Sequence, residues 1–158
     1  MHINWIKIYY DLIDLWKTRG HLTGPFKSLK CSDYQKNYRL PNGQWKYQRH
    51  HIDEINISGL VLKVRFPDEY KNSEAIIITF EQHLLLHYII VNARTTYPNN
   101  GMLKQTGVDE WDAIVQLECT EHQVPYFSGW YNHFSTIEGR KKQKQYINDC
   151  MIPRLKKN

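Results

Sequence analysis

The chain has 158 residues, enough for one ordinary domain with its own core. Its 41% hydrophobic and 23% charged residues are the balance of a globular protein and exclude a disordered one. No stretch approaches the apolar length of a membrane span, and the first residues do not resemble a secretion signal. Three scattered cysteines argue against a disulfide framework, so we expect a reducing, cytoplasmic compartment.

Charge is unevenly distributed along the chain. Residues 1–137 carry fourteen Lys and Arg and fourteen Asp and Glu, whereas residues 138–158 carry seven and two. The whole formal net charge of +5 therefore lies in the C-terminal tail. A basic tail on a neutral body suits either contact with a polyanion or a solvated helix face, and charge alone leaves both open.

The N-terminal third contains one clear helical pattern. Apolar residues from Ile3 to Trp16 follow helical spacing, and this segment predicts a packing helix that ends near Gly20. Residues 22–47 are irregular and rich in turn signals. Basic and aromatic residues alternate there, which suits either phosphate contact and base stacking or a packed loop. The basic residues are Lys27, Lys30, Lys36, Arg39, Lys46 and Arg49.

The middle of the chain contains four histidines in two pairs. Residues 44–52 alternate weakly and predict a strand that carries the adjacent pair His50 and His51. Residues 57–66 alternate more regularly and predict another strand, with Lys63 and Arg65 on one face. Residues 67–73 are rich in turn formers and predict a connection.

The second histidine pair lies on a predicted helix. The β-branched run from Ala75 to Ile78 favours a short strand. Thr79 and the glutamine three residues later have the spacing of a capping box, and residues 80–91 predict a buried helix. Residues four apart share one helix face, so His83 and His87 should point the same way.

The C-terminal part begins after a turn-rich stretch at residues 98–101. The boundary either separates residues 1–98 from an extension at 99–158 or lies within one continuous domain. Residues 109–117 predict a helix with Trp111, Ile114 and Val115 inward. Residues 140–155 predict a basic terminal helix that Pro153 interrupts.

The histidine region resembles the HNH endonucleases, also called ββα-metal nucleases, and is closest to the phage-encoded homing type. That family has an Asp or His followed by an invariant His, an Asn that opens a short strand, an apolar run, a Thr or Ser cap, and an Asn or His nine residues after the first Asn. Many members add a further His four residues later. The matching residues here are His50, His51, Ala75 to Ile78, Thr79, His83 and His87. Glu74 stands where the family usually has Asn.

The resemblance implies an α+β protein with a ββα-metal nuclease core and flanking helices, which hydrolyses DNA phosphodiester bonds. It implies His51 as the general base and one divalent ion, Mg, Mn, Ni or Zn, bound by His50, His83 and His87. Because adjacent strand residues face opposite ways, we expect a bulge or twist that brings His50 to the metal. We expect Glu74 to accept a hydrogen bond from His51, the alternatives being a metal ligand or a solvent-facing side chain.

The implied partner is double-stranded DNA, in a bacterial or phage-infected cell and without a membrane. An HNH-type restriction endonuclease and a non-catalytic DNA- or metal-binding module remain alternatives. So does a purely structural role, with His83 and His87 in the core and His50 and His51 in a surface loop. The sequence leaves the oligomeric state open. The expected DNA contacts are Lys46, Arg49, Lys63, Arg65, Arg140, Lys141, Lys142 and Lys144.

Overall fold

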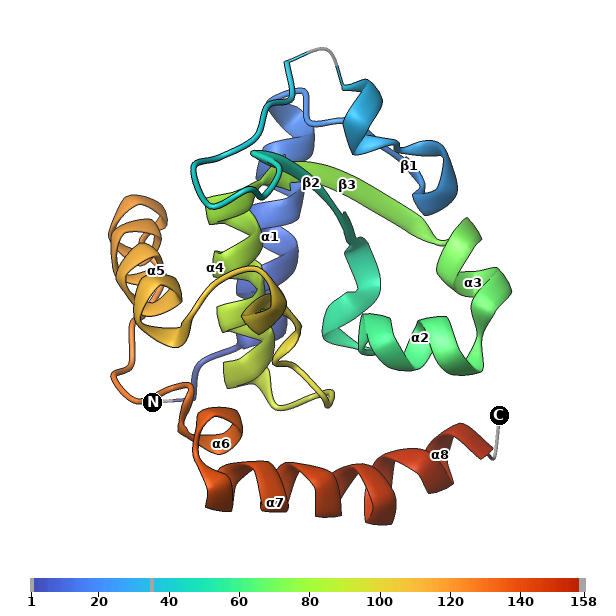
Figure 1. The fold of residues 1–158 in the computed structure, drawn as a ribbon, viewed down its shortest axis with the longest axis vertical. Coiled ribbons are helices and arrows are strands. Elements are labelled where there is room, and N and C mark those ends of the chain that lie inside the picture. Colours follow the sequence, from blue (N-terminus) through green and yellow to red (C-terminus); the bar gives the residue numbers. More distant parts are fainter. Residues whose placement is uncertain (1, 35, 157–158) are drawn as a thin grey trace.

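The computed structural model describes residues 2–34 and 36–156, which form a mixed α+β protein (Figure 1). A small three-stranded antiparallel sheet has the order β1-β3-β2, so β3 is central. The strands are β1 (Thr23–Pro25), β2 (Tyr47–His51) and β3 (Glu74–Thr79). None of the helices in these described residues combines the length and the apolar character that a membrane span requires.

The central strand β3 is buried on both of its faces, as its apolar sequence predicts. Ile76 and Ile78 are fully buried on one face, and Ala75 and Ile77 are buried on the other. A strand covered on both faces reads as a continuous hydrophobic run instead of an alternating one. The predicted strand at residues 75–78 is therefore confirmed.

Helix α4 (Phe80–Ala93) follows β3 directly and begins at the predicted capping box. The Thr79 hydroxyl accepts a hydrogen bond from the Gln82 backbone N–H, and the Gln82 side chain accepts one from the Thr79 N–H. Helix α1 (Trp5–Thr18) and helix α5 (Val108–His122) both pack against α4. All three helices confirm predicted helical segments.

One hydrophobic core extends through both halves of the chain. Tyr9, Ile13 and Trp16 of α1 are fully buried in it, together with the inner face of β3 and most of α4. Trp111 of α5 belongs to the same cluster, as does Phe134 further along the chain. Residues 98–101 therefore connect two parts that share a core.

The predicted strand at residues 57–66 is wrong, because this segment forms helix α2 (Gly59–Arg65). Helix α3 (Pro67–Asn72) replaces the predicted turn-rich connection. Both edges of β3 are already paired, with β1 and β2, so β3 offers this segment no strand partner. Helix α2 buries only Leu62. As a consequence Lys63 and Arg65 lie about 200° apart around a helix and do not share a face.

The C-terminal helices run along one edge of the molecule (Figure 1). They are α6 (Asn132–Ser135), α7 (Ile137–Tyr146) and α8 (Ile152–Lys156), with a π-helical turn at Ile147–Met151. The predicted basic helix is confirmed. Its regular α-helical geometry gives way to the π-helical turn just before Pro153, and the chain then continues as α8. Short 3-10 turns complete the fold at Phe26–Ser28, Cys31–Asp33, Ile52–Ile55 and Gly101–Lys104.

Candidate metal centre

Three of the predicted site histidines converge inside the molecule. His50 comes from β2, and His83 and His87 come from successive turns of α4. Each offers one ring nitrogen, and these nitrogens all lie within 4.8 Å of one another. The three residues are only 1%, 8% and 6% exposed. The structure therefore forms a buried three-histidine group that could hold a metal ion.

Regular strand geometry places His50 in this group. The β2–β3 ladder runs without a bulge from Tyr47 opposite Thr79 to His51 opposite Ala75. His50 pairs with Ile76, whose side chain faces the core and α4. The expected bulge is therefore wrong, because ordinary alternation already directs His50 toward α4.

Two side chains fix the proton positions on these rings. The Tyr9 hydroxyl lies 2.7 Å from His50 Nε2 and donates its own proton to the Ile52 carbonyl at 2.8 Å. His50 Nε2–H must then donate to Tyr9, which leaves a lone pair on His50 Nδ1. Gln48 Oε1 accepts from His83 Nδ1 at 2.7 Å, so His83 Nε2 also keeps its lone pair.

Within the described part of the chain, two buried histidine nitrogens have no hydrogen-bond partner: His50 Nδ1 and His87 Nδ1. An unpartnered buried polar atom costs free energy, so such atoms call for an explanation. Burial lowers the pKa of His50 and His83 well below the usual value and lowers the pKa of His87 to about 4. The imidazoles are therefore neutral near pH 7, which is the form that binds metal ions, and the residues fit a divalent ion.

Glu54 is a site residue that the sequence analysis missed. It lies in the 3-10 turn after β2, with its carboxylate 3.3 Å from His50 Nδ1 and 3.7 Å from His87 Nε2. Burial raises the pKa of Glu54 to about 7. The only signal in the sequence is that Glu54 lies four positions after His50. A spacing of four places two residues on the same face of a helix, but His50 lies near the end of a strand, so the spacing did not indicate a shared site.

His51 lies on the opposite face of the ladder from His50, because it pairs with Ala75. Its Nε2–H donates to the Tyr70 carbonyl at 2.7 Å, and its ring stacks on Phe26 with centroids 3.9 Å apart. Burial lowers the pKa of His51, so the ring is neutral near pH 7. Its Nδ1 keeps a lone pair, which is the chemical requirement for a general base.

Glu74 does not orient His51, in contrast to the expectation from the sequence. It shares a face of β3 with Ile76, whereas His51 pairs with Ala75 on the other face. The Glu74 side chain is 56% exposed, and its carboxylate lies 3.5 Å from the Lys17 ammonium group. The Tyr70 carbonyl takes the place expected of Glu74 as the partner of the His51 ring. Of the three alternatives for Glu74, the solvent-facing position is the one observed.

Two pockets open next to the histidine group. One, of about 260 Å³, is lined by Glu54 and His87 together with residues 98–101 and Lys104. The other, of about 430 Å³, is lined by His83, Arg49 and Lys30 among others. The group can therefore be approached from two directions, each past a basic side chain.

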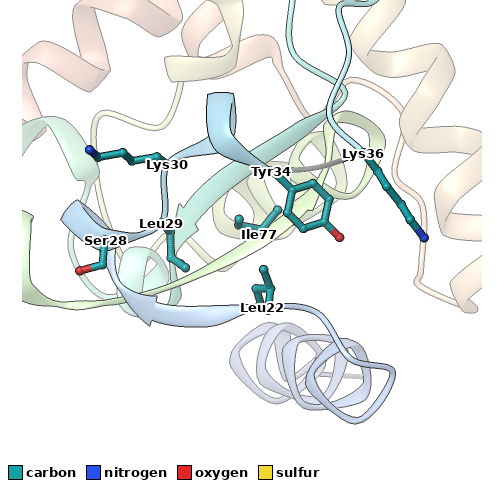
Figure 2. A pocket seen from close by; sticks show the side chains of 7 residues that line it. All are labelled: Leu22, Ser28, Leu29, Lys30, Tyr34, Lys36 and Ile77. Atoms are coloured by element: carbon teal, nitrogen blue, oxygen red, sulfur yellow. The ribbon is translucent and has the colours of Figure 1, made fainter.

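A third pocket, of about 370 Å³, lies on the outer face of the sheet. Figure 2 shows the Tyr34 ring beside Ile77 of β3 and Leu22, with Lys30 and Lys36 extending away on either side. The pocket thus combines an aromatic ring, apolar side chains and two lysines. All of its lining residues except Ile77 belong to residues 22–47, the segment in which basic and aromatic residues alternate.

The predicted DNA contacts near β2 are engaged within the protein. Lys46 is 2.6 Å from the Glu81 carboxylate with only 21% of its side chain exposed. Arg49 donates to the Phe26 carbonyl at 2.8 Å, and its guanidinium lies 3.8 Å from the Phe26 ring centroid. Lys46 therefore connects the start of β2 to α4, and Arg49 connects β2 to the turn at Phe26.

The remaining predicted DNA contacts are exposed. Lys63 and Arg65 lie on α2, and the other four lie on α7. Lys142 is 3.2 Å from the exposed Glu138 carboxylate one helical turn earlier. The exposed cations on α7 are Arg140, Lys141, Lys142 and Lys144.

A second group of possible ligands lies on α5. Ligand atoms of Glu118, Glu121 and His122 lie within 4.8 Å of one another, and the His122 ring is 3.4 Å from the Glu118 carboxylate. Only Glu121 is exposed, whereas the His122 and Glu118 side chains are 9% and 14% exposed, and an ion pair one helical turn apart explains their arrangement without an ion. We assign no site there.

Comparison with protein-family models, with curated proteins and with solved structures finds no match to this chain in any of the three.

Proposed function

We propose that this protein is a metal-dependent endonuclease of the HNH type, which hydrolyses phosphodiester bonds in double-stranded DNA. The observation that carries the proposal is the meeting of His50 on β2 with His83 and His87 on α4. The pairing of β2 with β3 and the direct passage of β3 into α4 support the proposal. The finer assignment as a ββα-metal core belongs to this proposal.

Each residue of the proposed site has a chemical role. His50, His83 and His87 would bind one divalent ion, which supplies counter-charge to the phosphate oxygens and assists the leaving oxygen. Imidazole ligands favour Zn, Ni or Co over Mg, which prefers oxygen. His51 Nδ1 would take the proton of the attacking water while the Tyr70 carbonyl holds the ring by its other nitrogen.

The exposed cations of α2 and α7 would contact the DNA backbone, since phosphate contacts supply most of the non-specific affinity. A homing role and a restriction role share this chemistry. The neighbouring genes distinguish them, because a restriction enzyme normally lies beside a methyltransferase gene.

The decisive experiment combines cleavage with metal binding. Purified protein is incubated with supercoiled plasmid and Mg²⁺, Mn²⁺, Ni²⁺ or Zn²⁺, with and without a chelator. We expect nicked or linear plasmid with at least one metal and none with chelator. His83→Ala should lose both cleavage and calorimetric metal affinity, whereas His2→Ala, a change at an exposed histidine, should lose neither.

A non-catalytic metal-binding module is the second candidate, and the burial of the site favours it. The three ligands are at most 8% exposed, and His51 is 5% exposed beneath Phe26 and Tyr70. This candidate predicts a metal-dependent rise in melting temperature without cleavage under any of the four metals. That outcome would reject the nuclease proposal.

A further inference from the structure

We propose that Glu54 is a fourth ligand of the metal, so that the centre consists of three imidazoles and one carboxylate. This inference rests on the proposed metal site and deepens it. The resemblance to HNH nucleases assigns no role to this position, and the support comes from proton positions, atomic separations and charge.

The proton positions leave two acceptors facing each other. Tyr9 donates to the Ile52 carbonyl and therefore accepts from His50 Nε2–H. His50 Nδ1 then carries a lone pair, and it faces the Glu54 carboxylate oxygen at 3.3 Å. Two such acceptors repel each other unless a proton or a metal ion lies between them. His50 Nδ1 makes no hydrogen bond to a described residue of this structure, which favours a metal ion bound by both atoms.

Two of the separations from Glu54, those to His50 and His87, are close to the spacing of ligands around one ion. Zinc–nitrogen and zinc–oxygen bonds are about 2.0–2.2 Å long, which in a tetrahedral site spaces neighbouring ligand atoms by roughly 3.3–3.5 Å. The Glu54 oxygens lie 3.3 Å from His50 Nδ1 and 3.7 Å from His87 Nε2. Hydrogen bonds to a carboxylate are shorter, about 2.7–2.9 Å when charged. His50 Nδ1 indeed has no hydrogen-bond partner among the described residues despite its proximity to Glu54.

Charge also favours a carboxylate at this place. Three neutral imidazoles would leave a divalent ion with its full charge among side chains that are at most 8% exposed. A buried charge is costly unless it is paired. Only 16% of the Glu54 side chain is exposed, so its carboxylate would offset half of that charge without water between them.

The test measures the metal site directly. Zinc and cobalt affinities are determined by calorimetry for the full chain, for Glu54→Gln and for Glu74→Gln. Glu54→Gln should weaken binding about tenfold or more. Glu74→Gln, which neutralises an exposed carboxylate beside Lys17, should bind like the parent. Circular dichroism confirms that each variant is folded.

A crystal structure with zinc distinguishes a ligand from a neighbour that merely orients a histidine. We expect a Glu54 oxygen within about 2.0–2.2 Å of the ion. A zinc ion on the three histidines with Glu54 out of contact would overturn this inference and leave the proposed function intact. Parent protein that binds no divalent ion would overturn both.

Discussion

His50 and His51 are adjacent in sequence but lie in different surroundings. His50 is bound by the Tyr9 hydroxyl and presents Nδ1 toward Glu54, among the other histidines. His51 is held by the Tyr70 carbonyl between aromatic rings on the other face of the ladder. Strand alternation separates the two rings, so changes at each should have separable effects.

We predict that His51→Ala lowers the cleavage rate about 10²–10⁴-fold, because it removes the proposed base. Metal affinity should remain at the parental value, because no ligand is removed. Plasmid cleavage kinetics and calorimetry on the same preparation measure both quantities. A variant that cleaves at the parental rate would show that His51 is not the base.

We predict that Tyr9→Phe weakens metal binding about tenfold, because it removes the group that orients His50 and sets its proton position. Tyr10→Phe is the matched control, since the Tyr10 hydroxyl bonds to Asp53 and to Asn56 away from the histidines. Calorimetric titration with Zn²⁺ compares the two variants. Equal affinities would mean that Tyr9 only fills space in the core.

At the scale of single elements, helix α5 carries an acidic residue in an unfavourable place. Burial, with help from the nearby Glu121 and Glu81 carboxylates, raises the pKa of Glu118 to about 7. Because the folded-state pKa lies above the unfolded value of 4.5, the fold loses stability as the pH rises between these two values.

We therefore predict that Glu118→Gln stabilises the protein at pH 8 and has little effect at pH 4.5. After allowance for solvent screening at this half-buried position, the gain at pH 8 should be about 1 kcal/mol. Urea unfolding at the two pH values measures it, with Glu121→Gln as an exposed neighbouring control. A gain of equal size at both pH values would contradict ionisation as the cause.

The packing of α6 against α7 depends on one glycine. A Cβ atom at Gly139 would lie 2.4 Å from the Asn132 carbonyl oxygen and 2.5 Å from the backbone of His133. We predict that Gly139→Ala destabilises the protein by about 1–3 kcal/mol, the usual cost of overpacking. Gly101→Ala is the control, because a Cβ there meets nothing within 4 Å. Urea unfolding of both variants would contradict the prediction if their midpoints were the same.

At the scale of the whole molecule, the basic tail is attached to the loop beside the buried three-histidine group. Asn99 lines the pocket that contains Glu54 and His87, and its side chain accepts hydrogen bonds from His133 and from Gln143 of α7. Two hydrogen bonds therefore connect the basic C-terminal helices to the loop beside the histidine group. Residues 157 and 158 of the tail lie outside the described residues.

We predict that replacing Arg140, Lys141 and Lys144 together by Gln reduces the salt dependence of DNA binding. The slope of log K against log salt concentration should fall by roughly 0.9 for each phosphate group that the tail no longer neutralises. Fluorescence anisotropy at several salt concentrations measures it. The control replaces Lys7, Lys17 and Arg19 of the N-terminal helix region by Gln, with the same change in net charge. Equal slopes for the two triple variants would identify the tail as a solvated face.

Local signals in the sequence were sufficient to predict several elements of this fold. The capping box at Thr79, the apolar run of β3 and the helical periodicity of α1 and α4 depend on neighbours in the chain, and all were predicted. Helical periodicity also predicted that His83 and His87 share a face. The position of His50 beside them required the resemblance to a known family as well, because His50 is far from them in sequence.

Packing between distant segments produced the features that the sequence did not predict. Alternation at residues 57–66 suits a strand, but the two neighbours of β3 leave it no edge, and the segment forms α2. The partner of His51 is the Tyr70 carbonyl and not Glu74. Every residue has a backbone carbonyl, so the sequence does not indicate which carbonyl will accept this hydrogen bond. Glu54 lies beside the histidines because the turn after β2 folds back toward α4. The direction that the chain takes after β2 depends on tertiary packing and could not be predicted from the sequence pattern.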